Sequence, residues 1–308
     1  MDKFEFLPDD FEFVGENHDI TKDVLAPTKP AWKDALGRFM KNKGAVVGAI
    51  CIMIITLFAI IAPMLSSWEF DAMNTQIKNI VPNLQHWFGT DVYGRDLWVR
   101  IWQGTRYSLF IAVVAILIDV VVGITYGMIS GYFGGKVDAA MQRFQEIMNS
   151  IPTLVILIIL LMFMKASLVT IIVALSFTEW IGMSRITRAQ VLKIKEEEFV
   201  LASHTLGASD FFIIFKEILP NVYSQMIIMV MMSIPNAIFY EAYLSFIGLG
   251  LPKPLASLGT LINEGYDSFL VYPYMMLIPV IIFSILMLSF NLFGDGLRDA
   301  LDPTMKEM

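Results

Sequence analysis

Three carboxylate residues interrupt long apolar runs of this sequence: Asp119, Glu179 and Glu241. A charged side chain at the centre of a bilayer costs about 2.5 to 3.5 kcal/mol on insertion scales, so such residues face other helices or a water-filled path. They could relay protons or ions, contact a polar solute in transit, or form hydrogen bonds that hold helices together. For Asp119 and Glu179 the sequence leaves the structural and the transport interpretation open.

A translocation path is the favoured interpretation for Glu241, because it precedes the Gly- and Pro-rich stretch FIGLGLPKP. Broken backbone of this kind is tolerated in a membrane only where it lines a cavity or packs on protein. The same apolar run carries Met232, Pro235 and Asn236. Proline removes a helical hydrogen bond and methionine packs adaptably, so Met232 and Asn236 form a candidate gate. Methionines are equally ordinary in a lipid-facing helix.

Other chemistries have little support in the sequence. The stretch GYFGGKV is one residue too short for a phosphate-binding loop and lacks its Ser or Thr, so another chain would hydrolyse any ATP. The three histidines, His18, His86 and His204, have no paired ligand spacing and predict no metal site. No hydrolase motif is present. The sequence therefore predicts a protein that is not an enzyme and binds no cofactor itself.

Membrane-spanning helices are needed to position the three carboxylates. Of the 308 residues, 56% are hydrophobic and 17% are charged, far from the balance of a soluble domain. A net charge of -7 without a dense Lys/Arg run argues against a nucleic-acid partner. The sequence predicts an all-α protein with six transmembrane helices, at 44–67, 108–133, 147–164, 166–183, 224–246 and 272–293.

One of these helices carries glycines at every fourth position. Gly123, Gly127 and Gly131 therefore lie on one face, and they predict close packing against a neighbouring helix.

The apolar runs also divide the chain. Residues 1–29 hold eight acidic residues against three lysines, lack helical periodicity, and predict a flexible cytoplasmic tail. Residues 30–43 have apolar residues at helical spacing among basic ones, as expected of an amphipathic helix at the membrane lipid interface. The permease domain is predicted over 44–300, followed by a tail at 301–308. Lys and Arg favour the connections on one side, which predicts that both termini are cytoplasmic.

The longest inner connection, 184–223, contains the stretch EFVLASHTLGASDFFIIFKEILPN. Gly207 in its middle, followed by polar capping residues, predicts a helix, a glycine turn and a second helix. This second helix, 211–219, is expected to end at Pro220 and to be about 14 Å long, too short to span a bilayer. Its apolar side chains need cover, either from the protein's own bundle or from a partner that docks there.

The stretch LASHTLGASDFFIIFKEILPN resembles the cytoplasmic signature loop of importer-type ABC transporter permeases. Its usual form is Glu-Ala-Ala, three residues, Gly, and then a helix that ends in Leu-Pro. Leu201 and Ser203 depart from that form, at the glutamate and the second alanine. In that family the loop forms the coupling helix that sits in a cleft of the ATPase subunit. The resemblance assigns this coupling role to Leu201, Ala202, Ser203, Gly207, Ala208, Ser209, Asp210, Phe211, Phe215, Leu219 and Pro220.

Three further segments are similar to the dipeptide and oligopeptide branch of these permeases, specifically its shorter six-helix subunit. They are FGTDVYGRDLWVRIWQGTRYSL, GYFGGKVDAAMQRFQEIMNSIP and EAYLSFIGLGLPKPLASLGTLINEG. The resemblance implies the type I ABC importer permease fold, located in the cytoplasmic membrane of a bacterium. It also implies peptide import together with a second homologous permease subunit, an extracytoplasmic peptide-binding protein, and two ATP-binding cassette ATPase subunits that use ATP and Mg.

Other functions stay open at this point. Nickel and other small-solute ABC importers share much of the pattern. An ion-coupled secondary transporter would use Asp119, Glu179 and Glu241 as a relay, and its uptake would survive ATP depletion and collapse with an uncoupler. A scaffold that recruits a soluble protein through residues 211–219 would bind its partner without moving any solute.

Overall fold

The structure is a computed structural model that describes residues 31–165 and 167–301. The predicted acidic tail at 1–29 lies outside the described residues, as does the C-terminal tail after Leu301. The described residues form helices and loops without a β-strand. The helices are α2 (Ala31–Lys41), α3 (Lys43–Leu65), α4 (Leu97–Phe133), α5 (Gly135–Asn149), α6 (Thr153–Phe163), α7 (Leu168–Ile194), α8 (Glu198–Thr205), α9 (Asp210–Phe212), α10 (Leu219–Leu244), α11 (Leu258–Tyr266) and α12 (Tyr274–Leu301).

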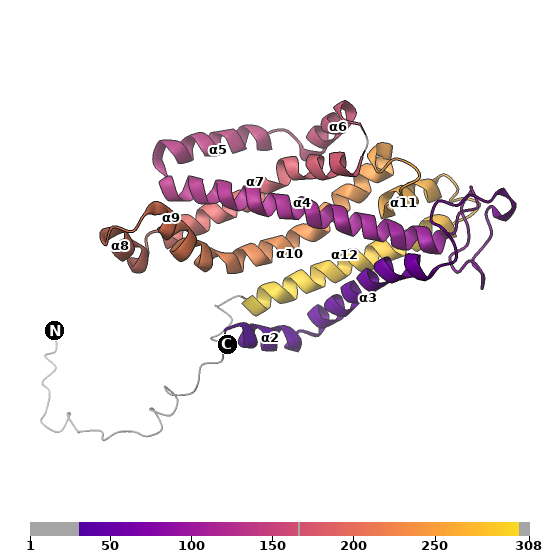
Figure 1. Ribbon diagram of the computed structural model, residues 1–308, viewed down its shortest axis with the longest axis horizontal. Coiled ribbons are helices and arrows are strands. Elements are labelled where there is room, and N and C mark those ends of the chain that lie inside the picture. Colours follow the sequence, from indigo (N-terminus) through magenta and orange to yellow (C-terminus); the bar gives the residue numbers. More distant parts are fainter. Residues whose placement is uncertain (1–30, 166, 302–308) are drawn as a thin grey trace, which may run out of the picture.

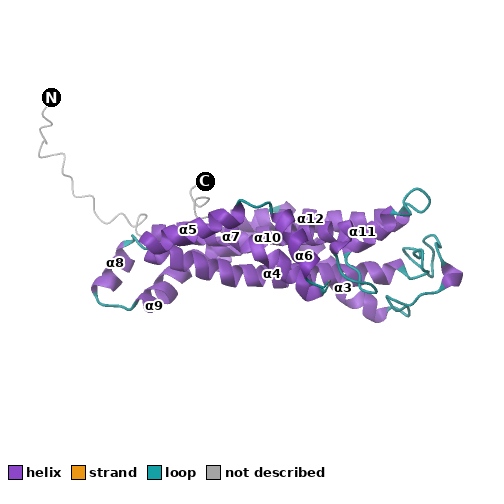
Figure 2. Cartoon of the chain, turned by 90° about the horizontal axis from the view of Figure 1, so that it is seen from above, coloured by secondary structure: helices purple, strands orange, loops and turns teal. Residues whose placement is uncertain are grey.

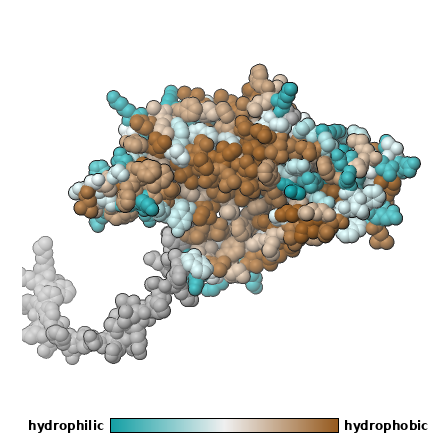
Figure 3. Space-filling view, in the orientation of Figure 1, coloured by the Kyte–Doolittle hydropathy of each residue, from teal (hydrophilic) through white to brown (hydrophobic). Residues whose placement is uncertain are grey.

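The long helices lie side by side in an elongated bundle (Figures 1 and 2). We call one end of it the hairpin end, because α8 and α9 project there. The other is the loop end, formed by α11 and the 66–96 segment. Hydrophobic residues dominate the middle of the visible surface, and hydrophilic residues gather toward both ends (Figure 3). This distribution is typical of a bundle that crosses a membrane along its long axis.

Five helices are long and apolar enough to cross a membrane: α3, α4, α7, α12, and α10 with the π-helical segment Ser245–Leu249 that follows it. The bent pair α5 and α6 adds a sixth crossing if it is counted as one span. The predicted total of six therefore agrees with the fold.

The third predicted span was wrong as a single helix at 147–164. The chain breaks between Asn149 and Thr153, and α5 and α6 meet at an angle of 78°. Pro152 explains the break, because a proline disfavours helical backbone at the residue before it. The 11 residues of α6 reach about 16 Å, roughly half of a hydrocarbon core.

Two other helices extend well beyond their predicted spans. Helix α4 begins at Leu97 rather than at 108. The side chain of Asp96 caps this start by accepting a hydrogen bond from the backbone N–H of Val99 at 3.0 Å. Helix α7 continues past 183 to Ile194. Hydropathy marks where a helix leaves the apolar layer, but a helix whose polar residues find partners continues beyond it.

Helix α2 precedes the first span, in the region predicted as an interfacial helix. Its Trp32, Leu36 and Met40 are exposed, whereas the ring of Phe39 packs edge-on against Phe293 of α12, with the ring centroids 5.5 Å apart. The exposed apolar side chains suit a membrane interface, and that location stays a prediction.

The predicted glycine face joins α4 to α7. A Cβ added at Gly123 would lie 2.7 Å from the Cβ of Met183, and one at Gly127 would lie 2.5 Å from the carbonyl oxygen of Ser184. A Cβ at Gly131 would meet the side chain of Val191 at 2.8 Å. The prediction of close packing is confirmed, because only glycine leaves room for this approach.

We predict that Gly127→Ala destabilises the folded protein by about 1 to 3 kcal/mol, because the new methyl group would push against the backbone of α7. Gly182→Ala is the matched control, since an added Cβ there meets nothing within 4 Å. Thermal unfolding of the purified proteins in detergent measures both. Equal melting temperatures for the two variants would contradict the proposed contact.

Candidate functional site

The helix–turn–helix predicted around Gly207 is present at the hairpin end. Helix α8 ends at Thr205, and Gly207 turns the chain with a φ of 81°, a left-handed conformation that favours glycine. The side chain of Ser209 then caps α9 by accepting a hydrogen bond from the backbone N–H of Phe212 at 3.3 Å. We call residues 198–218 the coupling hairpin.

The second arm of the hairpin is not the separate short helix that the sequence predicted. Helix α9, the π-helical segment Ile213–Ile218 and α10 follow one another without a break, and Pro220 lies in the first turn of α10. The backbone N–H of Leu219 donates to the carbonyl of Ile214, five residues back. This wider turn accommodates a proline that an α-helix interior would resist. The arm is therefore an extension of a membrane-spanning helix.

The coupling hairpin has one face buried and one face exposed. Val200, Ile213 and Ile218 are buried in a core that includes Met128 of α4 and Val191 of α7. The opposite face presents an apolar surface that we call the hairpin patch. It consists of Phe199, Leu201, Leu206, Phe211, Phe212 and Phe215. The bundle therefore covers one face of the hairpin, and cover of the other face by a partner stays a prediction.

Within the hairpin patch, the most exposed apolar side chains lie near the glycine turn. The side chain of Leu206 is 88% exposed and that of Phe211 is 71% exposed. The ring of Phe211 lies against the ring of Phe215, with the centroids 4.4 Å apart. Side chains of this size at such exposure are not part of the core of the described chain.

Polar contacts tie the hairpin together and to the bundle. The hydroxyl of Ser203 donates to the carboxylate of Glu217, which joins α8 to the second arm. The hydroxyl of Tyr132 in α4 donates to Asp210 at 2.6 Å. The remaining predicted coupling residues form none of these polar contacts. Ala202 and Pro220 are exposed, and Ala208 and Leu219 pack partly against the core.

Glu241 lies in a closed hydrogen-bond network. Its side chain is fully buried and accepts hydrogen bonds from the hydroxyls of Ser108 and Ser245, each at 2.7 Å. Ser257, which caps α11, donates onward to Ser245 at 3.1 Å. The network joins α4, α10 and the start of α11. This is the geometry of an interhelical brace, whereas the sequence favoured a path.

Asp119 of α4 and Glu179 of α7 lie at the same level of the bundle. About one turn before the two carboxylates, the hydroxyl of Ser176 in α7 donates to the backbone carbonyl of Ala115 in α4 at 3.2 Å. One turn after Asp119, Gly123 of α4 packs against α7. Asp119 is therefore on the α7-facing side of its helix, at the level of Glu179. One carboxylate oxygen of Asp119 has no hydrogen-bond partner among the described residues.

The candidate gate residues Met232 and Asn236 lie on a different face of α10 from Glu241. Asn236 is exposed, and its side-chain amide lies 3.5 Å from the backbone carbonyl of Met232. Met232 is half-buried. Neither residue contacts the Glu241 network, so the structure does not bring the five predicted path residues together at one site. A role in a gate stays a prediction for both.

At the loop end, four charged residues form a cluster that the sequence did not predict. Arg95 and Arg100 are each only 1% exposed. Arg95 donates to Asp91 at 2.6 Å and to Glu264 of α11 at 2.9 Å, and Arg100 reaches the same Glu264 oxygen at 3.0 Å. Two of the segments that carry the family resemblance contain these residues. The resemblance of these two segments was the sequence signal that could have pointed to the cluster. The count of Lys and Arg residues used to orient the chain did not distinguish buried arginines from exposed ones.

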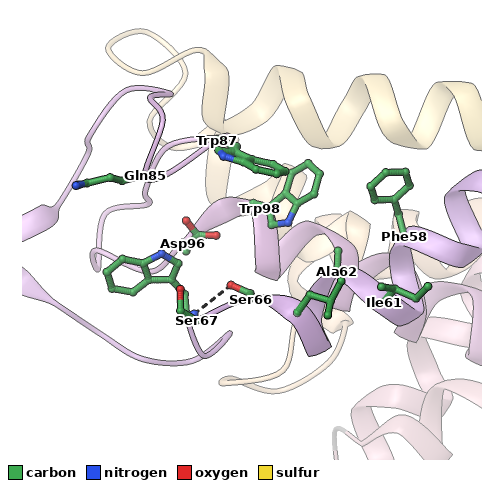
Figure 4. A pocket seen from close by; sticks show the side chains of 11 residues that line it. Phe58, Ile61, Ala62, Ser66, Ser67, Gln85, Trp87, Asp96 and Trp98 are labelled. Carbon is green, nitrogen blue, oxygen red and sulfur yellow. Dashed lines mark hydrogen bonds between the residues drawn. The ribbon is translucent and has the colours of Figure 1, made fainter.

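A groove of about 350 Å³ lies beside this cluster, between the end of α3 and the 66–96 segment (Figure 4). The rings of Trp87 and Trp98 line it side by side, with their centroids 4.6 Å apart. Asp96, the one charged residue of its lining, is bound to His86 at 2.8 Å. The groove therefore offers apolar rings rather than a charged site.

Long apolar helices with an exposed hairpin at one end define a polytopic membrane subunit built to engage another protein. Residues 123–307 match the family described as binding-protein-dependent transport system inner membrane component. Residues 31–84 match the family described as the N-terminal TM domain of oligopeptide transport permease C. The chain belongs to the inner-membrane permease components of binding-protein-dependent transport systems, and the family predicted from its sequence motifs is confirmed.

Similar proteins cover nearly the whole chain. The chain is 43% identical over 297 residues to the oligopeptide transport system permease protein OppC of Bacillus subtilis (strain 168), covering 96% of this chain and 97% of that protein. It is 41% identical to the dipeptide transport system permease protein DppC of the same organism, covering 97% and 94%. For OppC of Escherichia coli (strain K12), the identity is 42%, with 88% and 91% covered.

The fold is also that of a solved transporter. A structure of the MetNI methionine ABC transporter in an inward-facing conformation aligns with a TM-score of 0.54 and 20% identity. The alignment covers 66% of this chain and 96% of that one. The predicted fold class, an all-helical ABC importer permease, is thus confirmed.

We predict that Glu264→Gln lowers the free energy of unfolding by about 3 kcal/mol, because it leaves the buried Arg95 and Arg100 with one fewer counter-charge. Asp267→Asn, in the exposed residue that ends the same helix, is the control and should change little. Thermal unfolding of the detergent-purified proteins tests both. A melting temperature for Glu264→Gln equal to that of the control would show that the cluster contributes no stability.

Proposed function

We propose that this chain is one of the membrane-spanning subunits of an ATP-driven importer that carries peptides into the cell. The observation that carries the proposal is the exposed hairpin patch at the tip of an extension of α10. The relatives named for oligopeptide and dipeptide transport cover almost the whole chain, which supports peptides as the substrate class. A nickel or other small-solute importer is less well supported.

The hairpin end faces the cytoplasm in this proposal. Basic residues gather there, as expected for the inner side of a membrane protein. They are Arg185, Arg188, Lys193, Lys195 and Lys216. Helix α2 and the C-terminal part of α12 contact one another through Phe39 and Phe293 on this side of the bundle, which supports the expectation that both termini are cytoplasmic. The loop end then faces the outside of the cell.

Two ATPase subunits dock at the hairpin end, one of them on the hairpin patch of this chain. They bind ATP and Mg and carry out the hydrolysis, while this chain acts as a transport subunit rather than an enzyme. A second, homologous permease completes the translocation path. An extracytoplasmic peptide-binding protein delivers substrate at the loop end, where the aromatic groove presents apolar surface for it.

Movement of the ATPases reaches the membrane through rigid connections. Because α9 and α10 are continuous, a displacement of the hairpin tip tilts α10 directly. The buried Ile213 and Ile218, together with the hydrogen bond from Tyr132 to Asp210, carry the same displacement to α4. The bundle then changes its tilt as a rigid body, which is one of the established forms of domain switching.

An ion-coupled transporter is the second candidate, supported by the two neighbouring carboxylates Asp119 and Glu179. The ATP-driven importer and the ion-coupled transporter are distinguished by the energy source that drives uptake. Peptide uptake into cells that stops on ATP depletion and persists with an uncoupler supports the importer. Uptake with the opposite dependence would replace it with the ion-coupled transporter.

We predict that Leu206→Asp combined with Phe211→Asp abolishes co-purification of ATPase subunits and peptide uptake, because two charges would be buried in the docking surface. Quantitative pull-down from membranes, normalised to the amount of tagged chain, measures the loss.

Leu206→Met keeps the surface apolar and should keep the ATPases bound. Leu84→Asp, in an exposed residue of the loop end, should also keep them, whatever it does to uptake. Retention of ATPase by the double variant at normal abundance would rule out docking at the hairpin patch.

A further inference from the structure

The membrane-spanning part of the chain has acidic residues without a basic counterpart. Lys, Arg and His are absent from the apolar stretches of the described helices. These stretches are 44–65, 107–135, 153–164, 168–184, 221–249 and 274–294. Asp119, Glu179 and Glu241 all lie within them. Because an uncompensated carboxylate is costly in this layer, each of the three needs hydrogen bonds or a cation.

Only one of the three has its hydrogen-bond partners among the described residues. Glu241 is satisfied by Ser108 and Ser245. Asp119 is 6% exposed, yet one of its carboxylate oxygens is unpaired among the described residues. Glu179 is half-buried and forms no hydrogen bond or ion pair with any residue in the described part of the chain. Two acidic groups at the same level of the bundle are thus left without compensation among the described residues.

A third helix contributes polar groups at the same place. Helix α10 packs against α7, and Tyr240 of α10 is partly buried against the core that includes Leu175, one turn before Glu179. Asn236 and Tyr243, four residues before Tyr240 and three after it, share its face of α10, and both are exposed. An exposed polar helix face in the membrane layer does not belong against lipid. The site at Glu179 therefore opens on a surface that faces water or a solute.

We infer that Glu179, with Tyr240 beside it and Asp119 behind it, binds the protonated amino group of a peptide during its passage through the membrane. The inference rests on the proposed function as a peptide importer. An ammonium group carries three N–H donors, which suit a carboxylate and a phenol oxygen. The face of the Tyr240 ring adds attraction for a cation.

The arrangement suits a substrate of variable sequence. The free amino terminus is common to unmodified peptides whatever their side chains, so one acidic site can receive all of them. Asp119 is a positioning residue in this account: it is buried behind Glu179 and adds negative charge without touching the peptide. A carboxyl group that simply stays protonated needs no opening toward an exposed polar face, whereas a peptide must reach the site from one.

The test uses the complete complex with p-benzoylphenylalanine in place of Tyr243, which lies on the exposed face near the site. Radiolabelled alanine peptides of two to five residues are supplied, and the complex is illuminated during ATP-driven uptake. We expect Glu179→Gln to reduce both the uptake rate at saturating peptide and the cross-linking yield by about tenfold, as expected for loss of one charged hydrogen bond. Glu179→Asp should restore most of both.

Two comparisons accompany this variant. Glu146→Gln makes the same chemical change at an exposed residue of α5 and should leave uptake and cross-linking unchanged. Desamino peptides, in which hydrogen replaces the terminal amine, should give the same low cross-linking yield in the wild type and in Glu179→Gln.

Three results would overturn the inference. Undiminished cross-linking in Glu179→Gln removes the peptide contact, and slower uptake with unchanged cross-linking assigns the residue to proton transfer. If Glu179→Gln separates the two permease subunits, Glu179 instead forms an ion pair with a basic residue of the second permease. If the wild-type complex takes up none of the alanine peptides, the proposed function fails instead, before any variant is compared.

Discussion

The close contact between α4 and α7 is the constraint on which the rest of the bundle depends. Glycines at 123, 127 and 131 allow the two backbones to approach, since apolar contact alone gives little driving force between helices in lipid. This contact sets the level at which Asp119 faces Glu179. It also fixes the end of α7, from which the coupling hairpin projects, so that both candidate sites derive their geometry from one helix pair.

The two ends of the bundle are stabilised by different interactions. At the loop end, the buried arginines Arg95 and Arg100 are fixed by directional ion pairs to α11, and removal of one partner leaves a buried charge. At the hairpin end, Ile213 and Ile218 are held by non-directional apolar contacts, and the hydrogen bond from Tyr132 to Asp210 ties the hairpin to α4. A hairpin held on its core at one end and a bundle fixed by ion pairs at the other suit a protein that transmits motion as a rigid body.

The three membrane carboxylates illustrate how similar residues differ through their surroundings. Glu241 accepts hydrogen bonds from Ser108 of α4 and from Ser245, one turn later in its own helix, and it thereby joins α4 to α10. Asp119 and Glu179 have no such donors among the described residues. A buried polar group that is satisfied stabilises structure, whereas one that is left unsatisfied indicates a ligand, a partner or a proton.

The sequence by itself determined the class of fold, the number of crossings, the glycine contact, the turn at Gly207 and the family, because hydropathy, residue spacing and motifs are local properties. It did not determine that α9 continues through Pro220 into α10, since the π-helical turn that admits the proline is a matter of backbone geometry. Nor could it pair Arg95 with Glu264 or enclose Glu241, because those partners are far apart in the chain. Tertiary structure decided which charges are satisfied, since only packing brings distant donors and acceptors within hydrogen-bond distance.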